Sequence, residues 1–556
     1  MVDPKRPRWH RGLLVSLLVP ALFVQLYLHS DSVTPESRLS VGLASLQARK
    51  IRSILEFLAS EHFKGRATGT PESQLTADYI AGIFNQDGLV PLARQGSSFI
   101  QEFELTQALA GDESLLRVEP AGASESPPKL RDDYIPAPWG RDGEISDRQL
   151  AFVGYGVRAP ELHYDDYAGI DVQGKVVFVI SKVPSFGKNG FANHITRADY
   201  EDPLEKTRLA QSLGAAGLIF IIQSADEIPS FRVTDISKSP IYLSQDVRSV
   251  SIPCIVGTFQ AGELLLGGNA SSPGDDLNAI KKRIDEQQSP ASFLLHKKVT
   301  LHTRYKRRDF LGYNVIGLVP GSNPALKDQV VVVSAHHDHL GVGEKQEIFF
   351  GADDDASGTT GVLELAEAFS KNPSKPARSV LFAAWGAEEV GLLGSKYYIC
   401  HPLLPLNQTI AQIQLDMIGR DEDRKGNPDT GIPDEKPEGN TNSVSVNGAP
   451  FSHELRRDLE ASNRAVGLEL KFRYDSGEEN LIKRSDHWPF LKAGIPSLLL
   501  FTGFHPDYHK ASDTADKIDY PKMERILKLV YRTIWELASQ ANPPDYCDEP
   551  FRSENP

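Results

Sequence analysis

Five short stretches in the second half of the sequence carry residue types that bind metal ions, and each follows an apolar run. Histidine nitrogen and carboxylate oxygen are donors that divalent cations accept from proteins. In open α/β sheets, sites form in the crevice at the carboxyl ends of the strands. We therefore expect side chains from separate strand ends to meet in one metal centre, drawn from residues 336–339, 353–355, 388–389, 416 and 505–509.

Cysteine does not contribute to this centre. The chain contains three cysteines, Cys254, Cys400 and Cys547, and no pair has metal-site spacing. An odd and sparse set of this kind is also not a disulfide framework. The metal ligands are therefore expected to be nitrogen and oxygen atoms.

Two adjacent glutamates, Glu388 and Glu389, suit two different roles in such a centre. A catalytic metal site keeps a position open for water, and the base that takes the water's proton should not itself be a ligand. Neighbouring residues in an extended turn point to opposite sides, so one glutamate can ligate while the other faces the water. Asp338, two residues after His336, is expected on the same side as that histidine, where a carboxylate can accept the ring N–H.

Taken in order, these motifs resemble the co-catalytic zinc exopeptidases of family 28, which include secreted bacterial aminopeptidases and glutamate carboxypeptidases. The resemblance covers residues from about 305 to 540. It rests on Ala-His-x-Asp at 335–338, Gly-Ala-x-Asp at 351–354, the pair at 388–389, the aspartate at 416 and Tyr-His at 508–509.

The resemblance also implies a role for each residue. Glu388 is the implied general base, and Asp338 is the implied partner of His336. Separately from the resemblance, Tyr508 could donate a hydrogen bond to the oxyanion in peptide hydrolysis. Two Zn²⁺ ions per chain are expected, as in other two-metal hydrolytic sites. The implied ligands are His336 and Asp416 for one ion, Glu389 and His509 for the other, and Asp354 for both.

Several neighbouring residues compete with these assignments. His337 and His339 could bind the metal as well as His336, since spacing alone does not separate them. Asp353 and Asp355 are expected on a solvated or helix-capping face, with Asp355 as a candidate N-cap. The remaining expectations are loop positions for His505 and Asp507, and either a supporting or a capping role for Asp486.

The alternation of apolar runs and helical stretches between about 305 and 540 predicts an α/β fold with a mostly parallel sheet covered on both faces. By resemblance, this is the phosphorylase/hydrolase-like zinc-exopeptidase fold. Residues 111–300 differ, with short β-type runs separated by Pro, Gly and Ser. The motifs at 154–156, 164–167, 174–177 and 214–217 resemble a protease-associated (PA) domain, which flanks the cleft in the family and carries no catalytic residues.

The length of 556 residues suggests about two domains. We expect an N-terminal helical part of the catalytic domain at 41–110 and an inserted PA-like domain at 111–300. The catalytic domain proper is expected at 305–541, before a tail at 542–556. A charged, Gly- and Pro-rich loop at 421–441 is expected to border the site.

The N-terminus reads as an export signal. Four basic residues precede the apolar run 12–28, so residues 1–30 are predicted to be a signal peptide or a membrane anchor. The expected location is outside the cytoplasm: periplasmic, secreted or attached to a membrane through residues 12–28. The net charge of −14 argues against nucleic acid as a partner.

The favoured function is a metallo-aminopeptidase that acts on peptide substrates. The alternative on the same site is a carboxypeptidase or dipeptidase, which needs arginines such as Arg420 or Arg484 to hold a substrate carboxylate. A glutaminyl cyclase fits less well because such relatives generally lack the inserted domain. A non-catalytic, receptor-like relative would be expected to have lost ligands, and every ligand position is filled here.

Overall fold

The computed structural model describes residues 35–119, 127–186, 191, 200–224, 227, 233, 235–267, 276–423, 440–475 and 481–547. The predicted export segment 1–30 lies outside these residues, as do most of the loop 421–441 and the end of the tail. Export, anchoring and the role of that loop therefore stay predictions. Within the described part of the chain, no helix has both the length and the apolar character that a membrane crossing requires.

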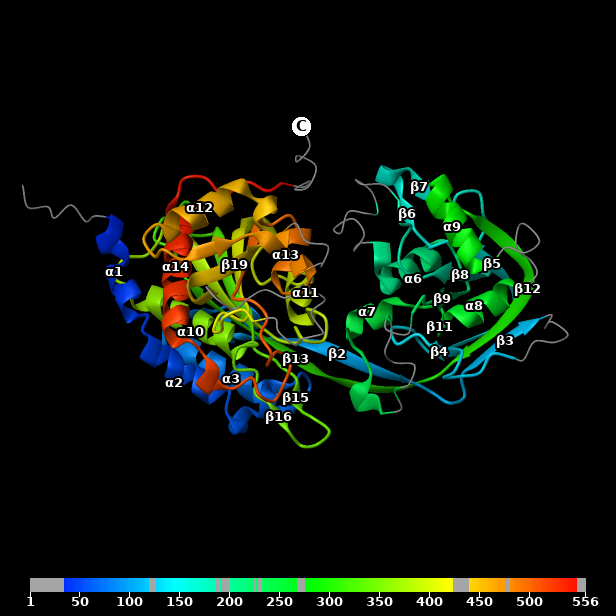
Figure 1. The fold of residues 1–556 in the computed structure, drawn as a ribbon, viewed down its shortest axis with the longest axis horizontal. Helices are drawn as coiled ribbons and strands as arrows, with labels where there is room; N and C mark the ends of the chain where they lie inside the picture. Colours follow the sequence, from blue (N-terminus) through cyan, green and yellow to red (C-terminus); the bar gives the residue numbers. More distant parts are fainter. Residues whose placement is uncertain are drawn as a thin grey trace, which may run out of the picture.

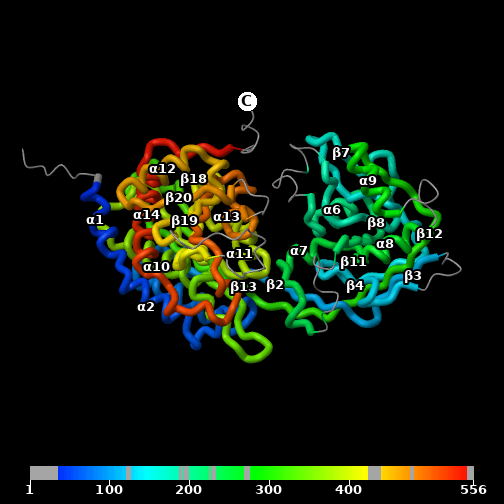
Figure 2. The backbone as a smooth tube through the Cα atoms, in the orientation of Figure 1, coloured from blue at the N-terminus to red at the C-terminus, as the bar shows by residue number. Residues whose placement is uncertain are grey.

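The described chain forms two lobes, each built around its own sheet (Figure 1). The tube view shows how the chain passes between them along the base of the molecule (Figure 2). It leaves the first lobe after β2 (Ile100–Ala110) and returns where β12 (Ser292–Thr303) gives way to β13 (Tyr305–Val319). Because all of β2 pairs antiparallel with the first part of β13, the two crossings are held together.

The first lobe contains a ten-stranded sheet whose centre is parallel. The parallel part, in spatial order, is β17 (Ser379–Trp385), β14 (Val330–His336), β18 (Thr409–Leu415) and β21 (Ser497–Phe501). The flanking strands are β13, β2, β10 (Ile241–Leu243) and β1 (Val90–Pro91) on one side, and β19 (Ser443–Asn447) and β20 (Glu469–Lys471) on the other.

Helices pack against this sheet (Figure 1). The central strands are fully buried and rich in Val, Ile and Leu, as expected for strands covered on both faces. The helices are α1 (Pro35–Ser45), α2 (Ala48–Leu58), α3 (Pro71–Gln86), α10 (Ala356–Lys371), α11 (Leu393–Cys400), α12 (His453–Asn463), α13 (His487–Lys492) and α14 (Tyr520–Ser539), with the short α4 (Ala93–Gly96) and α7 (Ser244–Ser249).

The second lobe contains a seven-stranded sheet with an apolar core on each face. Its strands, in spatial order, are β3 (Leu115–Glu119), β12, β5 (Gly143–Val153), β8 (Val176–Ile180), β9 (Gly217–Ile221), β11 (Cys254–Gly257) and β4 (Tyr134–Pro136). Its helices are α6 (Pro203–Ser212), α8 (Phe259–Leu266) and α9 (Leu277–Gln287). Two two-stranded sheets complete the fold, β6 (Arg158–Ala159) with β7 (Tyr164–Asp165) and β15 (Gly341–Val342) with β16 (Ile348–Phe349).

The predicted α/β class is confirmed, and a separate β-rich lobe accompanies the large sheet. The parallel arrangement holds for the four central strands, whereas the flanking strands join them antiparallel. The predicted domain boundaries stay predictions. One short piece of the segment 111–300 behaves differently from the rest, because β10 pairs with β2 in the sheet of the first lobe.

Candidate metal centre

The parallel strands of the first lobe end at one edge, and the metal-binding residue types follow those ends. His336 is the last residue of β14, and Asp416 comes directly after β18. Glu388 and Glu389 follow β17 after a short turn. Asp354 precedes α10, which packs against β14. Because these strands run parallel in one sheet, side chains that are distant in sequence meet at a common edge.

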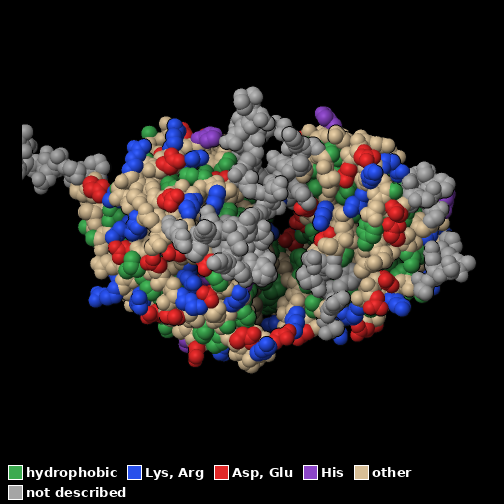
Figure 3. Space-filling model, in the orientation of Figure 1, with side chains coloured by type: hydrophobic (Ala, Val, Ile, Leu, Met, Phe, Trp, Pro, Cys, Tyr) green, Lys and Arg blue, Asp and Glu red, His purple; other side chains and the backbone are tan. Residues whose placement is uncertain are grey.

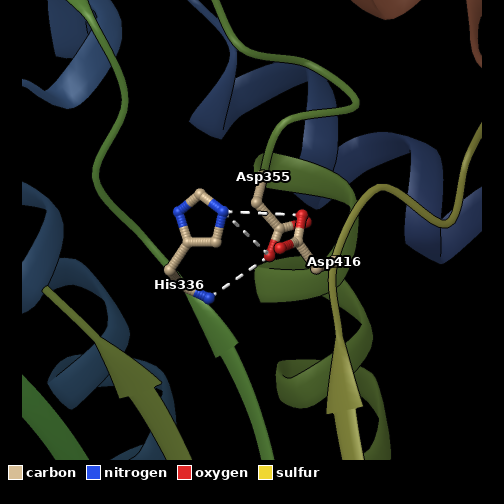
Figure 4. A group of neighbouring side chains, drawn as sticks. All are labelled: His336, Asp355 and Asp416. Carbon is tan, nitrogen blue, oxygen red and sulfur yellow. Dashed lines mark hydrogen bonds and ion pairs between the residues drawn. The ribbon is translucent and has the colours of Figure 1, made fainter. Parts of the chain in front are cut away.

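One group of these side chains surrounds His336. Its Nε2 atom lies 3.3 Å from Asp354 Oδ1 and 3.6 Å from Asp416 Oδ1. Asp355 Oδ2 lies 4.0 Å from the same nitrogen, and Figure 4 shows both Asp355 and Asp416 facing the ring. We call His336, Asp354 and Asp416 the first cluster.

The carboxylate of Asp355 is engaged in hydrogen bonds with backbone N–H groups. It accepts hydrogen bonds from the amide N–H groups of His336 (3.2 Å), Gly358 (2.8 Å) and Met417 (3.2 Å). The contact with Gly358 is the N-cap predicted for α10. The side chain is fully buried, so of the two expected placements the helix-capping one holds and the solvated one does not. Its role is to tie β14, α10 and the end of β18 together.

A second cluster forms around the other oxygen of Asp354. His509 Nε2 lies 3.1 Å from Asp354 Oδ2 and 3.2 Å from Glu389 Oε2. His339 Nδ1 lies 2.7 Å from Glu389 Oε1 and 3.8 Å from Asp354 Oδ2. Asp354 therefore presents one carboxylate oxygen to each cluster, which is the arrangement of a bridging ligand.

Two groups of side chains in the described residues have ligand atoms close enough together to hold a metal ion. One is His336, Asp355 and Asp416, and the other is His339, Asp354 and Glu389. Asp354 Oδ2, His509 Nε2 and His339 Nε2 are buried and make no hydrogen bond within the described structure. Buried polar atoms normally have partners, so the unsatisfied Asp354 Oδ2 and His509 Nε2, which lie 3.1 Å apart, fit the ligand atoms of a divalent cation.

Electrostatics support the same reading. Burial opposes ionisation of Asp354, but contacts with His336 and His509 outweigh it and hold its pKa well below the usual range. Burial likewise opposes protonation of His509, yet Asp354 and Glu389 raise its pKa to about 10. The cluster is thus a set of mutually attracting opposite charges, with an ionised Asp354 at its centre.

Glu388 lies beside the clusters without joining either. Its Oε2 atom is 3.9 Å from His336 Nε2, and the residue is 9 % exposed. Burial raises the pKa of its carboxyl well above the usual range, and the carboxylates of Glu389 and Asp416 add to this. A side chain with this affinity for a proton, at the edge of the centre, is placed to accept and return one.

The carboxylate of Asp338 does not make the expected contact with the ring of His336. His336 Nδ1 is 3.1 Å from the backbone carbonyl oxygen of Asp338 and 3.9 Å from its carboxylate. The carboxylate instead accepts from the backbone N–H of Glu388 (3.0 Å) and Glu389 (3.4 Å) and from the hydroxyl of Thr68 (2.9 Å). The predicted carboxylate–histidine hydrogen bond is therefore replaced by contacts that fix the Glu388–Glu389 turn.

The structure also separates the competing histidines. His337 turns away from the centre, with Nε2 2.7 Å from the carbonyl oxygen of Tyr313. His339 belongs to the second cluster. His505 lies in a loop, as expected, and is buried there with Nε2 3.2 Å from Asp353 Oδ2. Asp353 is fully buried rather than solvated. Asp353 also accepts from the backbone N–H of Gly419 at 2.7 Å, which explains why it is buried.

Two further acidic residues have structural partners. Asp507 pairs with Arg420 at 3.1 Å and with Lys517 at 2.7 Å. Asp486 is fully buried and accepts a hydrogen bond from the Ser395 hydroxyl. It makes no capping hydrogen bond to α13, so the capping alternative is not supported.

The sequence analysis gave no site role to Arg66. Its buried guanidinium donates to the backbone carbonyls of His337 (2.9 Å), Leu58 (2.9 Å), Phe350 (2.8 Å) and Gly351 (2.9 Å). It therefore clamps the segments that lead out of His336 and into Asp354. The one local signal in the sequence is the glycine that precedes Arg66. The structure shows why glycine stands there: Gly65 has a φ of +71°, and a Cβ at this position would lie 2.3 Å from the carbonyl oxygen of Phe349.

Asp513 was likewise not predicted. Its buried carboxylate accepts from the backbone N–H of Asp353 (3.0 Å) and Asp354 (3.2 Å). Thus both sides of the loop that carries Asp354 are held by side chains from distant parts of the chain. An exposed-looking Asp between Ser512 and Thr514 offers no local pattern from which this role could be read.

A pocket opens beside the two clusters, with about 430 Å³ of space between protein atoms, part of which is open solvent. Both clusters contribute to its lining, as do Glu388 and Tyr508. The Tyr508 hydroxyl accepts a hydrogen bond from Arg484 at 3.2 Å, and burial raises its pKa well above the usual range. In the space-filling view the two lobes are separated by a hollow (Figure 3).

Part of the chain is similar to known peptidases. Residues 314–534 match the model of "Peptidase family M28". The chain is 28 % identical over 256 residues to "Leupeptin-inactivating enzyme 1" of Streptomyces exfoliatus, covering 42 % of this chain and 50 % of that protein. It is 29 % identical over 238 residues to "Aminopeptidase YwaD" of Bacillus subtilis (strain 168), covering 42 % and 46 %.

A third relative, "Aminopeptidase" of Pseudomonas aeruginosa (strain UCBPP-PA14), is 33 % identical over 199 residues, covering 34 % of this chain and 31 % of its own length. The chain thus spans about half or less of the length of these relatives. Among solved structures, "Aminopeptidase from Aneurinibacillus sp. strain AM-1" aligns with a TM-score of 0.49 at 20 % identity, over 91 % of this chain and 97 % of that one.

Proposed function

We propose, from the premise that residues 314–534 belong to peptidase family M28, that this protein is a two-zinc aminopeptidase. The observation that carries the proposal is Asp354, whose two carboxylate oxygens each face a separate cluster of histidine and carboxylate donors. His336 and Asp416 would complete the ligands of one ion, and Glu389 and His509 those of the other.

His339 shares the second cluster with His509, and the geometry favours His509 as the ligand. His509 Nε2 faces two carboxylates, Asp354 at 3.1 Å and Glu389 at 3.2 Å. His339 faces the same carboxylates with Nδ1, at 2.7 Å from Glu389 but at the longer distance of 3.8 Å from Asp354, the residue that both clusters share. We therefore assign His339 to the orientation of Glu389.

The residues of this chain divide the work of peptide hydrolysis. When bound, a zinc pair supplies Lewis acidity that activates water and polarises a carbonyl group. Glu388 takes the proton of the attacking water and delivers it to the leaving nitrogen, so that a C–O bond forms as the C–N bond breaks. Tyr508 stays protonated because burial raises its pKa, and its hydroxyl can donate to the developing oxyanion.

The test is metal content together with a matched substrate panel. Purified protein should contain about two zinc ions per chain by elemental analysis. It should release the first residue of a peptide with a free amine and a C-terminal amide. Acetylation of that amine should abolish cleavage, because a buried carboxylate of the metal centre would then face an uncharged amide instead of the substrate's ammonium group.

A carboxypeptidase or dipeptidase on the same centre is the second candidate, and one observation favours it. Arg484 lines the pocket, where a guanidinium could bind a substrate carboxylate. Arg420, in contrast, is already paired with Asp507. Efficient cleavage of N-acetylated peptides with rejection of C-terminal amides would establish this alternative, and Arg484→Met should then raise KM selectively.

A further inference from the structure

The pocket beside the metal centre has a mixed lining that the hydrolytic steps do not use. Its wall is apolar and is built by Met417, Leu481, Leu499, Phe501 and Phe504, which pack in one cluster. Besides Glu388, Tyr508 and Arg484, the polar side chains of Asn447 and Ser485 also line the pocket.

These two polar side chains are buried and unsatisfied. Asn447 is 1 % exposed, and neither its amide nitrogen nor its amide oxygen has a hydrogen-bond partner within the described structure. Ser485 is 2 % exposed, and the same holds for its hydroxyl oxygen. Burying a polar group without a partner costs free energy, and native proteins contain few such groups. Their presence in a pocket wall is explained if a ligand supplies the missing partner.

The sheet register places Asn447 away from the metal edge. Strand β21 runs toward that edge and ends at Phe501, while Asn447 on antiparallel β19 pairs with Leu499. Two residues of strand correspond to roughly 7 Å, so Asn447 lies that far behind the end of β21. A side chain entering from the metal centre would pass apolar surface first and meet the amide at its far end.

Resting on the aminopeptidase function proposed above, we propose that this pocket receives the side chain of the substrate's first residue, and that Asn447 and Ser485 select a side chain with an apolar stem and a hydrogen-bonding end. Tyrosine has this chemistry, and phenylalanine is the same side chain without the hydroxyl. An amide offers a donor and an acceptor, so it can pair with a phenol in either direction. With phenylalanine bound, the amide stays buried and unpaired.

The decisive experiment compares tyrosine and phenylalanine p-nitroanilides with the zinc-loaded, full-length protein and with Asn447→Leu and Ser485→Ala. In the wild type, kcat/KM should favour tyrosine by about tenfold or more, because a site built to hydrogen-bond a hydroxyl discriminates against the analogue that lacks it. Asn447→Leu should bring the two substrates within about threefold of each other, mainly by improving phenylalanine. Ser485→Ala should shift the ratio in the same direction by a smaller factor.

A binding measurement makes the inference independent of turnover. Calorimetric titration with free L-tyrosine and L-phenylalanine should show tighter binding of tyrosine to the wild type and loss of that preference in Asn447→Leu. Equal cleavage of both substrates by the wild type would overturn the inference, as would an Asn447→Leu variant that lowers both equally, which indicates a role in folding or backbone binding. If neither p-nitroanilide is cleaved, the aminopeptidase proposal fails, and equal or absent binding of the two amino acids would then also refute the side-chain selection.

Discussion

Each lobe of this protein buries an aspartate, and the two aspartates differ in a way that separates a structural charge from a candidate site. Asp166, in the second lobe, is fully buried, and Asp354, in the first, is 3 % exposed. Asp166 accepts from the backbone N–H of Tyr155 and Val157, both at 3.0 Å, and from the Tyr164 hydroxyl at 2.6 Å. Asp354 Oδ2 has no hydrogen bond within the described structure and faces histidine nitrogens instead.

The difference shows that burial of a charge is not by itself a sign of function. A carboxylate whose oxygens are all taken up by nearby donors holds its own loop together, as Asp166 does between β5 and β7. A carboxylate left without donors, among other unsatisfied donors of nitrogen and oxygen, points to a ligand that is not part of the chain. The second lobe thus offers an internal control for the first.

The largest effect is expected at Glu388. Glu388→Gln keeps the shape of the side chain but removes its ability to take a proton, so turnover should fall on the order of 10²–10⁴-fold. Zinc content, measured by elemental analysis, should stay at the wild-type level because Glu388 belongs to neither cluster. A metal-loaded variant with near-normal turnover would show that another group is the base.

A matched pair of substitutions tests the comparison directly. Asp354→Asn should lower the content of both zinc ions and abolish most activity, since one residue faces both clusters. Asp166→Asn should leave zinc and activity unchanged while lowering the free energy of unfolding by about 1–3 kcal/mol, because an amide nitrogen would then face backbone donors. Elemental analysis and urea denaturation measure the two outcomes. Equal zinc loss in both variants would contradict the distinction between the lobes.

Substitution of Arg66 tests whether the metal centre of the first lobe depends on a side chain that lies outside the region matched by the family model. Arg66→Met leaves four buried carbonyl groups without their donor, so unfolding should become easier by roughly 3 kcal/mol or more. The conservative Arg66→Lys should recover only part of this, because an ammonium offers fewer donors in a different geometry. A positioning role further predicts that zinc is released at lower chelator concentration, and unchanged release would reduce Arg66 to a purely structural residue.

The smallest effect concerns Glu364 on α10, a buried carboxylate of the first lobe outside both clusters. Both of its oxygens lack a hydrogen bond within the described residues, Lys50 Nζ lies 3.6 Å away, and burial raises its pKa to about 7. The folded state therefore binds this proton more tightly than the unfolded state, so stability is lost as pH rises from about 4.5 through 7.

Glu364→Gln removes this titration. The variant should match the wild type near pH 4.5 and exceed it by about 1–3 kcal/mol at pH 8, in urea denaturation at both pH values. Activity should not change. An equal difference between the two proteins at both pH values would show that the carboxyl does not titrate in this window.

Much of the first lobe could be predicted because its signals are local. Fully buried parallel strands must be continuous apolar runs, and the helices between them must show helical spacing. The alternation predicted between about 305 and 540 is present as strands such as β14 and β17 and helices such as α14. Asp355 as N-cap was also a local prediction, since a cap bonds to backbone groups of its own helix.

The rest depends on contacts between segments far apart in the chain. Which strand ends lie side by side decides two of these contacts. Asp353 is buried against His505, and Asp338 holds the turn of Glu388 rather than the ring of His336. The place of His339 in the second cluster has the same origin.

The sequence by itself determined the residue types, their order and the alternation of strands and helices, because these are fixed by composition and by periodicity along one segment. Tertiary structure alone decided which oxygen of Asp354 faces which histidine, and which buried polar atoms remain without a partner. The physical reason is that hydrogen bonding is satisfied or left unsatisfied across the whole fold. No single stretch of sequence states where its donors and acceptors will find their partners.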